Sequence, residues 1–434
     1  MFKHKYRYLI AALLFLASAI NYIDRAAIGI VTPMLRKDLH LSPSQMGIAF
    51  SGFFIGYSLF AFVGGHLSDR FGPRRVMSWA MGCWSLLCGL TGATTGFASL
   101  LVVRVLFGFG EGPGLSTTSR TVANWFPKRE AGSVLGTILA GQMFGSAIAG
   151  PLITLLALAA GWRGAFVGTA LAGFVWLVCW RFAATDRPNQ SRHVDAVERH
   201  TIESDQADSV AADNPLSGDG ATLRDYLLCS GPFGVGLGLF AVNYTLYVLI
   251  SWLPTYLVDV HHVGVAQMGM LTAIPWIAGA LGSVLGGIGS DWLLRGGVGR
   301  DALRARKLST WVPLALSCAS VLMFSFATSL AVAVTCVTFA LLFVSAAGQA
   351  CWSITHELVP RRFVGGLGGF VHLLGNVAGI VGPAATGFAI QYLGGFSVAF
   401  RLCGAVDAIA VIAVLVLVRR PRFQATRSPM GMRP

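Results

Sequence analysis

The sequence predicts an all-α polytopic membrane protein with twelve transmembrane helices. Of its 434 residues, 55% are hydrophobic and only 12% are charged, whereas soluble proteins carry about a quarter charged residues. Apolar runs long enough to cross a bilayer, at about 20 residues per crossing, recur about twelve times. The approximate runs are residues 8–33, 44–66, 74–95, 98–122, 132–157, 163–184, 228–256, 265–290, 308–328, 330–356, 365–391 and 396–418.

Basic residues form short clusters between these runs, and their distribution predicts the orientation of the chain. If both termini are cytoplasmic, most of the 32 lysines and arginines lie in cytoplasmic loops. The opposite face then carries only Arg36, Lys37, Arg163 and Arg401. Such an asymmetry predicts cytoplasmic termini. Clusters placed in this way argue against a nucleic-acid surface, despite the net charge of +13.

Residues 186–224 differ from the rest of the chain because they are rich in acids and serines and poor in apolar residues. Such a segment cannot bury a core, so we expect a poorly ordered cytoplasmic linker. It separates an N-terminal six-helix bundle at 1–185 from a C-terminal one at 225–420. We expect residues 421–434 to form a cytoplasmic tail.

The two halves also echo each other in sequence. Residues 64–69 match 286–291, and residues 126–129 match 359–362. Two similar six-helix halves are typical of alternating-access transporters with a site near the membrane midplane. The sequence therefore predicts two pseudo-symmetric bundles.

An acid and a base stand in the middle of the first apolar run, within Asn-Tyr-Ile-Asp-Arg at residues 21–25. Ionisable side chains are costly inside a membrane and commonly mark an ion, proton or substrate path. We therefore interpret Asp24 and Arg25 as functional. The alternative is a buried pair that only fixes helix packing.

The fourth run supplies a second base and a second acid, Arg104 and Glu111. Counted from the outer ends of their spans at about 1.5 Å per residue, Asp24 and Arg104 lie within roughly 5 Å in depth. We expect Arg104 to engage Asp24, which leaves Glu111 nearer the midplane as an isolated carboxyl group. Carboxyl groups that move between water and an apolar wall can bind and release protons, so Glu111 is the stronger candidate for coupling.

The loop after the second run has the pattern Gly-His-Leu-Ser-Asp-Arg-Phe-Gly-Pro-Arg-Arg at residues 65–75. Asp69 can accept from the free N–H groups at a neighbouring helix start, and Arg70 or Arg74 can pair with acids across the cytoplasmic face. The alternative is a solvated basic loop that only sets topology. The predicted cytoplasmic gate consists of Gly65, Asp69, Arg70, Gly72, Arg74 and the matching Asp291.

This loop resembles the signature of the major facilitator superfamily between helices two and three. The motifs similar to its anion:cation symporter family are residues 21–25, Arg104, 107–113, 124–127, 141–142 and 252–257. Within that family, nearly the whole chain looks most like bacterial sugar-acid transporters of the D-galactonate:proton type. The resemblance implies the major facilitator fold and proton-coupled import of a sugar acid (hexonate, hexuronate or aldarate) across the bacterial inner membrane.

The resemblance also implies roles for individual residues. In the family, the aspartate and glutamate at these positions bind protons, and the arginine after the aspartate contacts the sugar acid. Proton binding would then belong to Asp24 and Glu111, and substrate contact to Arg25. Arg104 is assigned to proton coupling as well, because a nearby arginine affects how a carboxyl group binds protons. The other residues placed near the ligand in this half are Tyr22, Tyr57 and Gln142.

The second half departs from the galactonate pattern. Trp352 is retained, but its polar neighbours are replaced by Gln349, Ala350 and Cys351. His372 stands where a ligand-binding asparagine is expected, and it could bind an anion, titrate near neutral pH or simply pack. The further candidate ligand contacts are Asn243, Tyr244, Tyr247 and Asn376.

Other features have a structural interpretation. The glycines at 108, 110, 112 and 114 predict close helix packing. Asp407, within the last run, is interpreted as a structural pair or a lipid-side polar defect and not as a transport residue. The eight cysteines lie in or at the edge of apolar runs and are interpreted as packing residues, so no metal site or cofactor is expected.

Three functions compete. The leading one is symport of a small organic anion with protons by a monomer. An aromatic-carboxylate symporter of the same family is the alternative, since the tyrosines named above and Trp352 could stack on a ring. A membrane sensor without transport is disfavoured because the longest polar segment is about 40 residues. No nucleotide loop or nucleophile–base pair indicates an enzyme.

Overall fold

The computed structural model describes residues 5–212, 222–295, 302–360 and 363–419, and all regular structure in these ranges is helical. A 3-10 turn at Pro188–Gln190 lies between α6 and α7. The helices are α1 (Tyr6–Asp38), α2 (Pro43–Phe71), α3 (Pro73–Thr91), α4 (Phe97–Glu111), α5 (Gly114–Trp125), α6 (Lys128–Ala183), α7 (Ala196–Ala212), α8 (Leu223–Leu227), α9 (Ser230–Asp259), α10 (Val265–Arg295), α11 (Ala302–Phe324), α12 (Leu330–Leu358), α13 (Val364–Tyr392) and α14 (Phe396–Leu417).

These helices account for the predicted spans. Among the described residues, nine helices are long and apolar enough to cross a membrane, or ten if the bent α2 counts as one span. The other two predicted spans correspond to α3, with 19 residues, and to the second part of α6. Helix α6 has 56 residues but breaks at Ala160 and Gly161, where Gly161 has a φ of 71°. Spans five and six therefore share one element.

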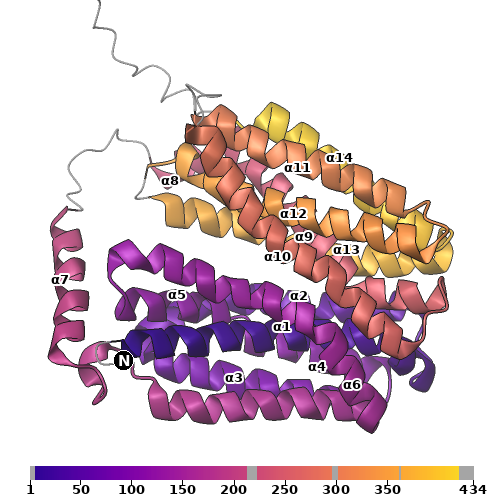
Figure 1. Cartoon of the computed structure of the whole chain (residues 1–434), viewed down its shortest axis with the longest axis horizontal. Coiled ribbons are helices and arrows are strands. Elements are labelled where there is room, and N and C mark those ends of the chain that lie inside the picture. The colour runs from indigo at the N-terminus through magenta and orange to yellow at the C-terminus, as the bar shows by residue number, and fades with distance from the viewer. Residues whose placement is uncertain (1–4, 213–221, 296–301, 361–362, 420–434) are drawn as a thin grey trace, which may run out of the picture. The chain divides into compact units, whose positions relative to one another are not determined.

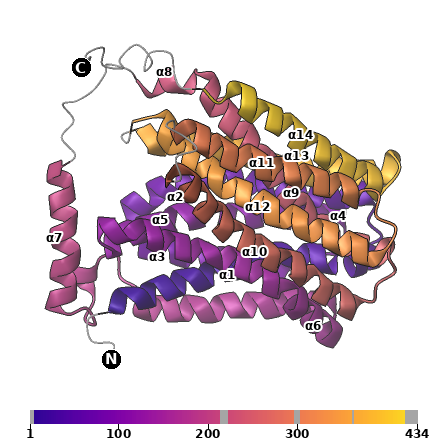
Figure 2. The ribbon, with the colours of Figure 1, turned by 45° about the horizontal axis from the view of Figure 1, so that its top comes forward.

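The chain forms two compact units. One comprises Met1–Ser217 and Ile250–Trp276, and the other comprises Gly218–Leu249 and Ile277–Pro434. Helices α9 and α10 are therefore each divided between the units. Within the first unit, α1 packs along α6, and the two helices lie side by side in Figures 1 and 2. The domain boundaries at 185 and 225 remain a proposal, and the predicted tail at 421–434 lies outside the described residues.

Local sequence signals set several helix ends. Ser42 and Gln45 form a capping box at the start of α2, with Pro43 at its first position. Pro113 lacks an N–H donor, and the fourth span is interrupted between α4 and α5 just after Glu111. The break places Glu111 at the carboxyl end of α4.

The internal repeat is visible in the backbone. His40 and His262 are the described non-glycine residues with positive φ, at 50° and 53°. His40 follows α1 and His262 follows α9, at the same sequence offset as the matched motifs that contain Asp69 and Asp291. Non-glycine residues rarely adopt this conformation, so its recurrence supports a structural repeat of α1 in α9.

The linker is more structured than the sequence predicts. Residues 186–212 include the 3-10 turn and α7, which lies at the end of the bundle where α1 begins (Figure 1). Glu198 is buried and accepts hydrogen bonds from the N–H groups of Tyr6 and Arg7, each at 3.1 Å. These N–H groups have no partner within α1. An acidic segment without a core can therefore still dock by capping a helix; residues 213–221 lie outside the described part.

The Asn-Trp pair at 124–125 also anchors the linker. Asn124 donates to the carbonyl oxygen of Asp186 at 2.9 Å, and Trp125 donates to that of Thr185 at 3.0 Å. The Asp186 carboxylate accepts from the backbone N–H of Arg74 at 2.9 Å and so caps α3. This motif therefore holds the linker on the first unit.

Replacing Gly72 by alanine is expected to destabilise the protein. Gly72 has a φ of 85°, and a Cβ there would meet the Asp186 carboxylate. Backbone strain of this kind costs about 1–3 kcal/mol, and displacing Asp186 also removes the cap of α3. The measurement is the thermal unfolding temperature of the detergent-solubilised protein. Gly132→Ala is the matched control, because a Cβ at Gly132 meets nothing within 4 Å; equal melting of the two variants would contradict this account.

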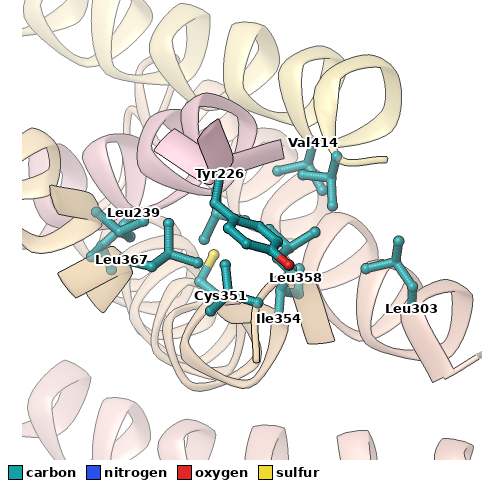
Figure 3. Close-up of a cluster of buried hydrophobic side chains, with 12 residues drawn as sticks. Tyr226, Leu239, Leu303, Cys351, Ile354, Leu358, Leu367 and Val414 are labelled. Carbon is teal, nitrogen blue, oxygen red and sulfur yellow. The ribbon is translucent and has the colours of Figure 1, made fainter. Parts of the chain in front are cut away.

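The second unit has a distinct apolar core (Figure 3). Tyr226 of the short helix α8 is 1% exposed. Its ring lies among Leu239, Cys351, Ile354 and Leu358. Burial of one aromatic ring therefore fixes the segment that leads from the linker into α9.

Candidate functional site

The centre of the first unit is a buried ion pair between Arg25 of α1 and Glu111 of α4. Arg25 is 6% exposed and Glu111 is 1% exposed. Breaking a buried pair by removing one partner is strongly destabilising, because the other charge stays behind without compensation. Any event that neutralises Glu111 therefore changes what Arg25 can bind.

Aromatic rings enclose the Arg25 guanidinium. Its carbon lies 4.8 Å from the ring centroid of Tyr22, 4.9 Å from Phe53, 5.0 Å from Tyr57 and 5.8 Å from Phe54. These four rings, from α1 and α2, are called the aromatic cage below. Cation–π contacts of this kind stabilise a desolvated guanidinium and hold its plane in one orientation.

Close packing of α2 on α4 brings the cage to the ion pair. A Cβ on Gly108 would meet the backbone of Phe53, and a Cβ on Gly56 would meet the backbone of Val105. Only glycine permits this approach. The interpretation of the α4 glycines as packing residues is therefore confirmed at Gly108, and also at Gly112, where a Cβ would crowd Phe60 and Ala61.

Arg104 shares a ring with Arg25. The Arg104 guanidinium carbon lies 4.9 Å from the centroid of Phe53 and 4.9 Å from that of Phe107. Its Nε is buried and has no hydrogen-bond partner among the described residues. Phe53 therefore contacts both guanidinium groups, and sequence reasoning missed it because an apolar residue in an apolar run carries no signal of its own.

Asp24 faces a different set of neighbours. It is 1% exposed, and its Oδ1 accepts from the Cys88 thiol of α3 at 3.5 Å. The same sulfur lies 3.2 Å from the hydroxyl of Thr169 in α6. In the described part of the chain Asp24 makes no ion pair, and its Oδ2 has no hydrogen-bond partner. Cys88 and Thr169 were not predicted; small polar residues in mid-span are the signal that could have found them.

The predicted pairing of the charges is therefore wrong. We expected Arg104 to engage Asp24 and Glu111 to be isolated, but Glu111 pairs with Arg25, and Asp24 is the acid that makes no ion pair within the described part of the chain. Successive helical residues point about 100° apart, so Arg25 faces α4 while Asp24 faces α3 and α6. Gln142, the remaining predicted residue of this unit, is half-buried in α6 beside Gly141.

The predicted residues of the second unit come from α9, α12 and α13, and several of them contact one another. Trp352 is 38% exposed, and its ring centroid lies 5.9 Å from that of the half-buried His372. Asn376 is 3% exposed; its carbonyl accepts from Tyr247 at 3.2 Å, and its amide donates to the backbone of His372 at 2.9 Å. Asn243 lies against Gly375.

Tyr244 is less accessible than Trp352 and His372. It is 3% exposed, and Gly382 of α13 packs on its ring. Its burial fits a supporting role in the wall better than first contact with a ligand. The described residues hold no group of three or more His, Cys, Asp or Glu that could bind a metal ion.

Comparison with known proteins identifies the family. The sequence profile of the Major Facilitator Superfamily matches residues 14–383. The chain belongs to the Major Facilitator Superfamily. It is 37% identical to the hexuronate transporter of Bacillus subtilis (strain 168), over 94% of this chain and 93% of that protein. It is 30% identical to a protein named probable L-galactonate transporter of Escherichia coli (strain K12), over 94% of this chain and 88% of that protein.

Solved structures support the major facilitator fold. A bacterial homolog of the human lysosomal transporter Spinster matches with a TM-score of 0.75 at 19% identity, over 96% of this chain and 98% of that chain. At this identity the match concerns the fold alone. Family and fold together make the chain a membrane transporter and not an enzyme.

The superfamily loop at residues 65–75 is arranged differently from the sequence-based expectation. Asp69 pairs with Arg120 of α5 at 3.2 Å, and Asp186, not Asp69, caps α3. Arg74 donates to the carbonyl oxygen of Arg181 at 2.6 Å rather than to an acid. Arg70 lies over the ring of Phe71, with 5.4 Å between guanidinium carbon and centroid. The role of these residues in a gate remains a proposal.

The remaining loop residues have local roles. Gly65 lies in α2, where a Cβ would stay 3.9 Å from Ser116, so this position has room for a side chain. In the second unit, Asp291 pairs with Arg306 at 2.9 Å. Arg306 also donates to Ser290 at 2.7 Å. Asp69 and Asp291, the aspartates of the two matched motifs, are therefore each paired with an arginine of the same unit.

Proposed function

We propose that the protein imports a sugar acid (a hexuronate, hexonate or aldarate) together with protons by alternating access. The observation that carries this proposal is the buried Arg25–Glu111 pair inside the aromatic cage. Relatives named for hexuronate and L-galactonate transport support the substrate class. We further propose that the protein lies in the bacterial inner membrane with both termini cytoplasmic, and that it acts as a monomer.

The pair suggests how a proton and an anion are coupled. Arginine binds a carboxylate through two parallel hydrogen bonds. While Glu111 is ionised, its Oε1 is paired with Nη2 of Arg25, so a substrate carboxylate cannot take both bonds. Protonation of Glu111 cancels its charge, so a substrate carboxylate can take its place on Arg25. A proton and an anionic substrate would then load together.

Asp24 is the proposed second proton site of the first unit. Its thiol and hydroxyl neighbours provide no positive charge, so an ionised Asp24 is costly in the membrane. We assign Arg104 to the same proton-coupling group, as a buried cation that couples the protonation of Asp24 electrostatically to that of Glu111. In the second unit the proposed substrate contacts are Trp352, His372, Asn243 and Asn376, with Tyr244 as a supporting residue of the wall.

The aromatic-carboxylate alternative is less well supported. Tyr22 and Tyr57 already contact the Arg25 guanidinium at 4.8 and 5.0 Å. Their rings are therefore engaged in holding a cation and are not open stacking platforms. A sensor without transport has no support from relatives that are named transporters.

Uptake into proteoliposomes with an inward-directed proton gradient tests the function. The panel contains a labelled hexuronate with a hexonate, an aldarate and an aromatic carboxylate as competitors. We expect accumulation of the hexuronate above the outside concentration, competition by sugar acids, and loss of accumulation when an ionophore collapses the gradient. Accumulation that survives the ionophore, or competition by the aromatic acid alone, would contradict the proposal.

A further inference from the structure

Asp407 of α14 is a buried carboxyl group that the proposed mechanism does not use. It is 0% exposed, so it is not the lipid-side defect that the sequence allowed. Its Oδ1 accepts from the hydroxyl of Thr245 in α9 at 3.0 Å, and its Oδ2 accepts from the hydroxyl of Ser317 in α11 at 3.0 Å. Both hydroxyl residues are also 0% exposed. One acid therefore connects three helices of the second unit.

Among the residues that the structure describes, no positively charged group interacts with Asp407. The titratable groups that face it are the thiols of Cys403, on its own helix, and of Cys318 on α11. Tyr244 of α9 interacts electrostatically with Cys403, and the Cys403 sulfur is 3.1 Å from the Thr245 hydroxyl. Among the described residues of α12 and α13, which pack on α11 and α14, no charged group interacts with the Asp407 carboxyl.

The cluster has a counterpart in the first unit. There Asp24 of α1 contacts Cys88 of α3, which contacts Thr169 in the second part of α6. In the sequence repeat α1, α3 and the second part of α6 correspond to α9, α11 and α14. Each cluster thus consists of three side chains, one from each of these three corresponding helices, and each side chain is either small and polar or acidic. The acid has moved from the first of these helices to the last.

We propose that Asp407, with Thr245 and Ser317, is a proton-binding site of the second unit. A carboxylate without a counter-ion is costly at membrane depth, and a proton removes that cost. Hydroxyl groups rotate to donate to a carboxylate or to accept from a protonated acid, so the same cluster holds both states. A metal cation fits less well, because hard cations take about six oxygen ligands and this cluster has four side-chain oxygens.

At this site one carboxyl group binds and releases a proton. The proposal rests on the proposed proton coupling and extends it to the second unit. Its test measures the protonation of Asp407 directly and does not depend on transport. The experiment is an infrared titration of the purified, detergent-solubilised protein, which follows the C=O stretch of protonated carboxyl groups. The difference between wild type and Asp407→Asn isolates the contribution of Asp407. Asp225→Asn is the matched control, since Asp225 is an exposed acid of the same unit that caps α8.

We expect wild type and Asp225→Asn to show a C=O contribution from one protonated carboxyl group at neutral pH, and this contribution to disappear as the pH is raised. We expect Asp407→Asn to lack this contribution at every pH. Identical titrations of wild type and Asp407→Asn would overturn the proposal. So would a contribution that persists at alkaline pH, which marks a permanently neutral structural acid, or one that disappears on adding sodium at fixed pH, which marks a metal-cation site.

A second variant covers the case in which Asp407→Asn does not fold. Ser317→Ala retains the acid but removes one of its two hydroxyl partners, so the midpoint of the same infrared contribution must shift. An unchanged midpoint would overturn the proposal. If the uptake experiment fails while this titration succeeds, the proposed substrate or its coupling is wrong and the proton site stands.

Discussion

Replacing Arg25 by lysine is expected to weaken binding of the proposed sugar-acid substrate about 30-fold, because one charge-assisted hydrogen bond is worth about 2 kcal/mol. A lysine ammonium keeps the charge but cannot form the two parallel bonds of a guanidinium. It also loses the planar contacts with the aromatic cage, where ring centroids lie 4.8 to 5.8 Å from the Arg25 guanidinium carbon. The measurement is the dissociation constant of the purified protein by calorimetry.

The chain offers a matched control for this change. Arg36 lies in the same helix and forms a partly exposed pair with Asp259 at 3.2 Å. Exposed pairs contribute about 0–1 kcal/mol, so Arg36→Lys is expected to leave the affinity unchanged. If Arg25→Lys binds the sugar acid as tightly as Arg36→Lys, Arg25 does not contact the substrate carboxylate.

The fold was predictable because the bilayer restricts what a chain can do. Long apolar runs must become helices, since every backbone polar group in lipid needs an internal partner. The repeated motifs at Asp69 and Asp291 indicated two similar halves, and the shared backbone conformation of His40 and His262 supports that repeat. Composition did not reveal that the linker docks on the first unit. A single carboxylate, Glu198, caps the start of α1, and one residue does not change the average composition of a segment.

The candidate site was predictable in its members but not in its pairs. Charges in an apolar run indicate function wherever they occur, so Asp24, Arg25, Arg104 and Glu111 were found. Counting residues along a helix gives depth but not direction around the axis. The direction in which each side chain points around its helix axis determines that Glu111 pairs with Arg25 and that Asp24 contacts Cys88.

Glu111→Gln is expected to abolish proton-driven accumulation while exchange of internal for external substrate continues. A gradient of about one pH unit supplies about 1.4 kcal/mol per proton, which is tenfold accumulation of substrate for one coupled proton. Glutamine keeps the size of the side chain and its hydrogen-bonding ability toward Arg25, but it cannot ionise. A neutral glutamine competes with a substrate carboxylate for Arg25 less strongly than an ionised glutamate, so the substrate binds without a proton and equilibrates instead of accumulating.

Asp24→Asn separates the two acids of the first unit. Asp24 contacts Cys88 and not the aromatic cage, so its replacement is expected to leave substrate affinity unchanged although accumulation is lost. Glu111→Gln removes the internal competitor of the substrate on Arg25, so affinity is expected to become insensitive to pH in that variant alone. Glu130→Gln, at a partly exposed pair with Arg7, is the control for protein level and insertion. Full accumulation by Glu111→Gln in proteoliposomes would mean that the proton travels by another route, with His372 the next residue to replace.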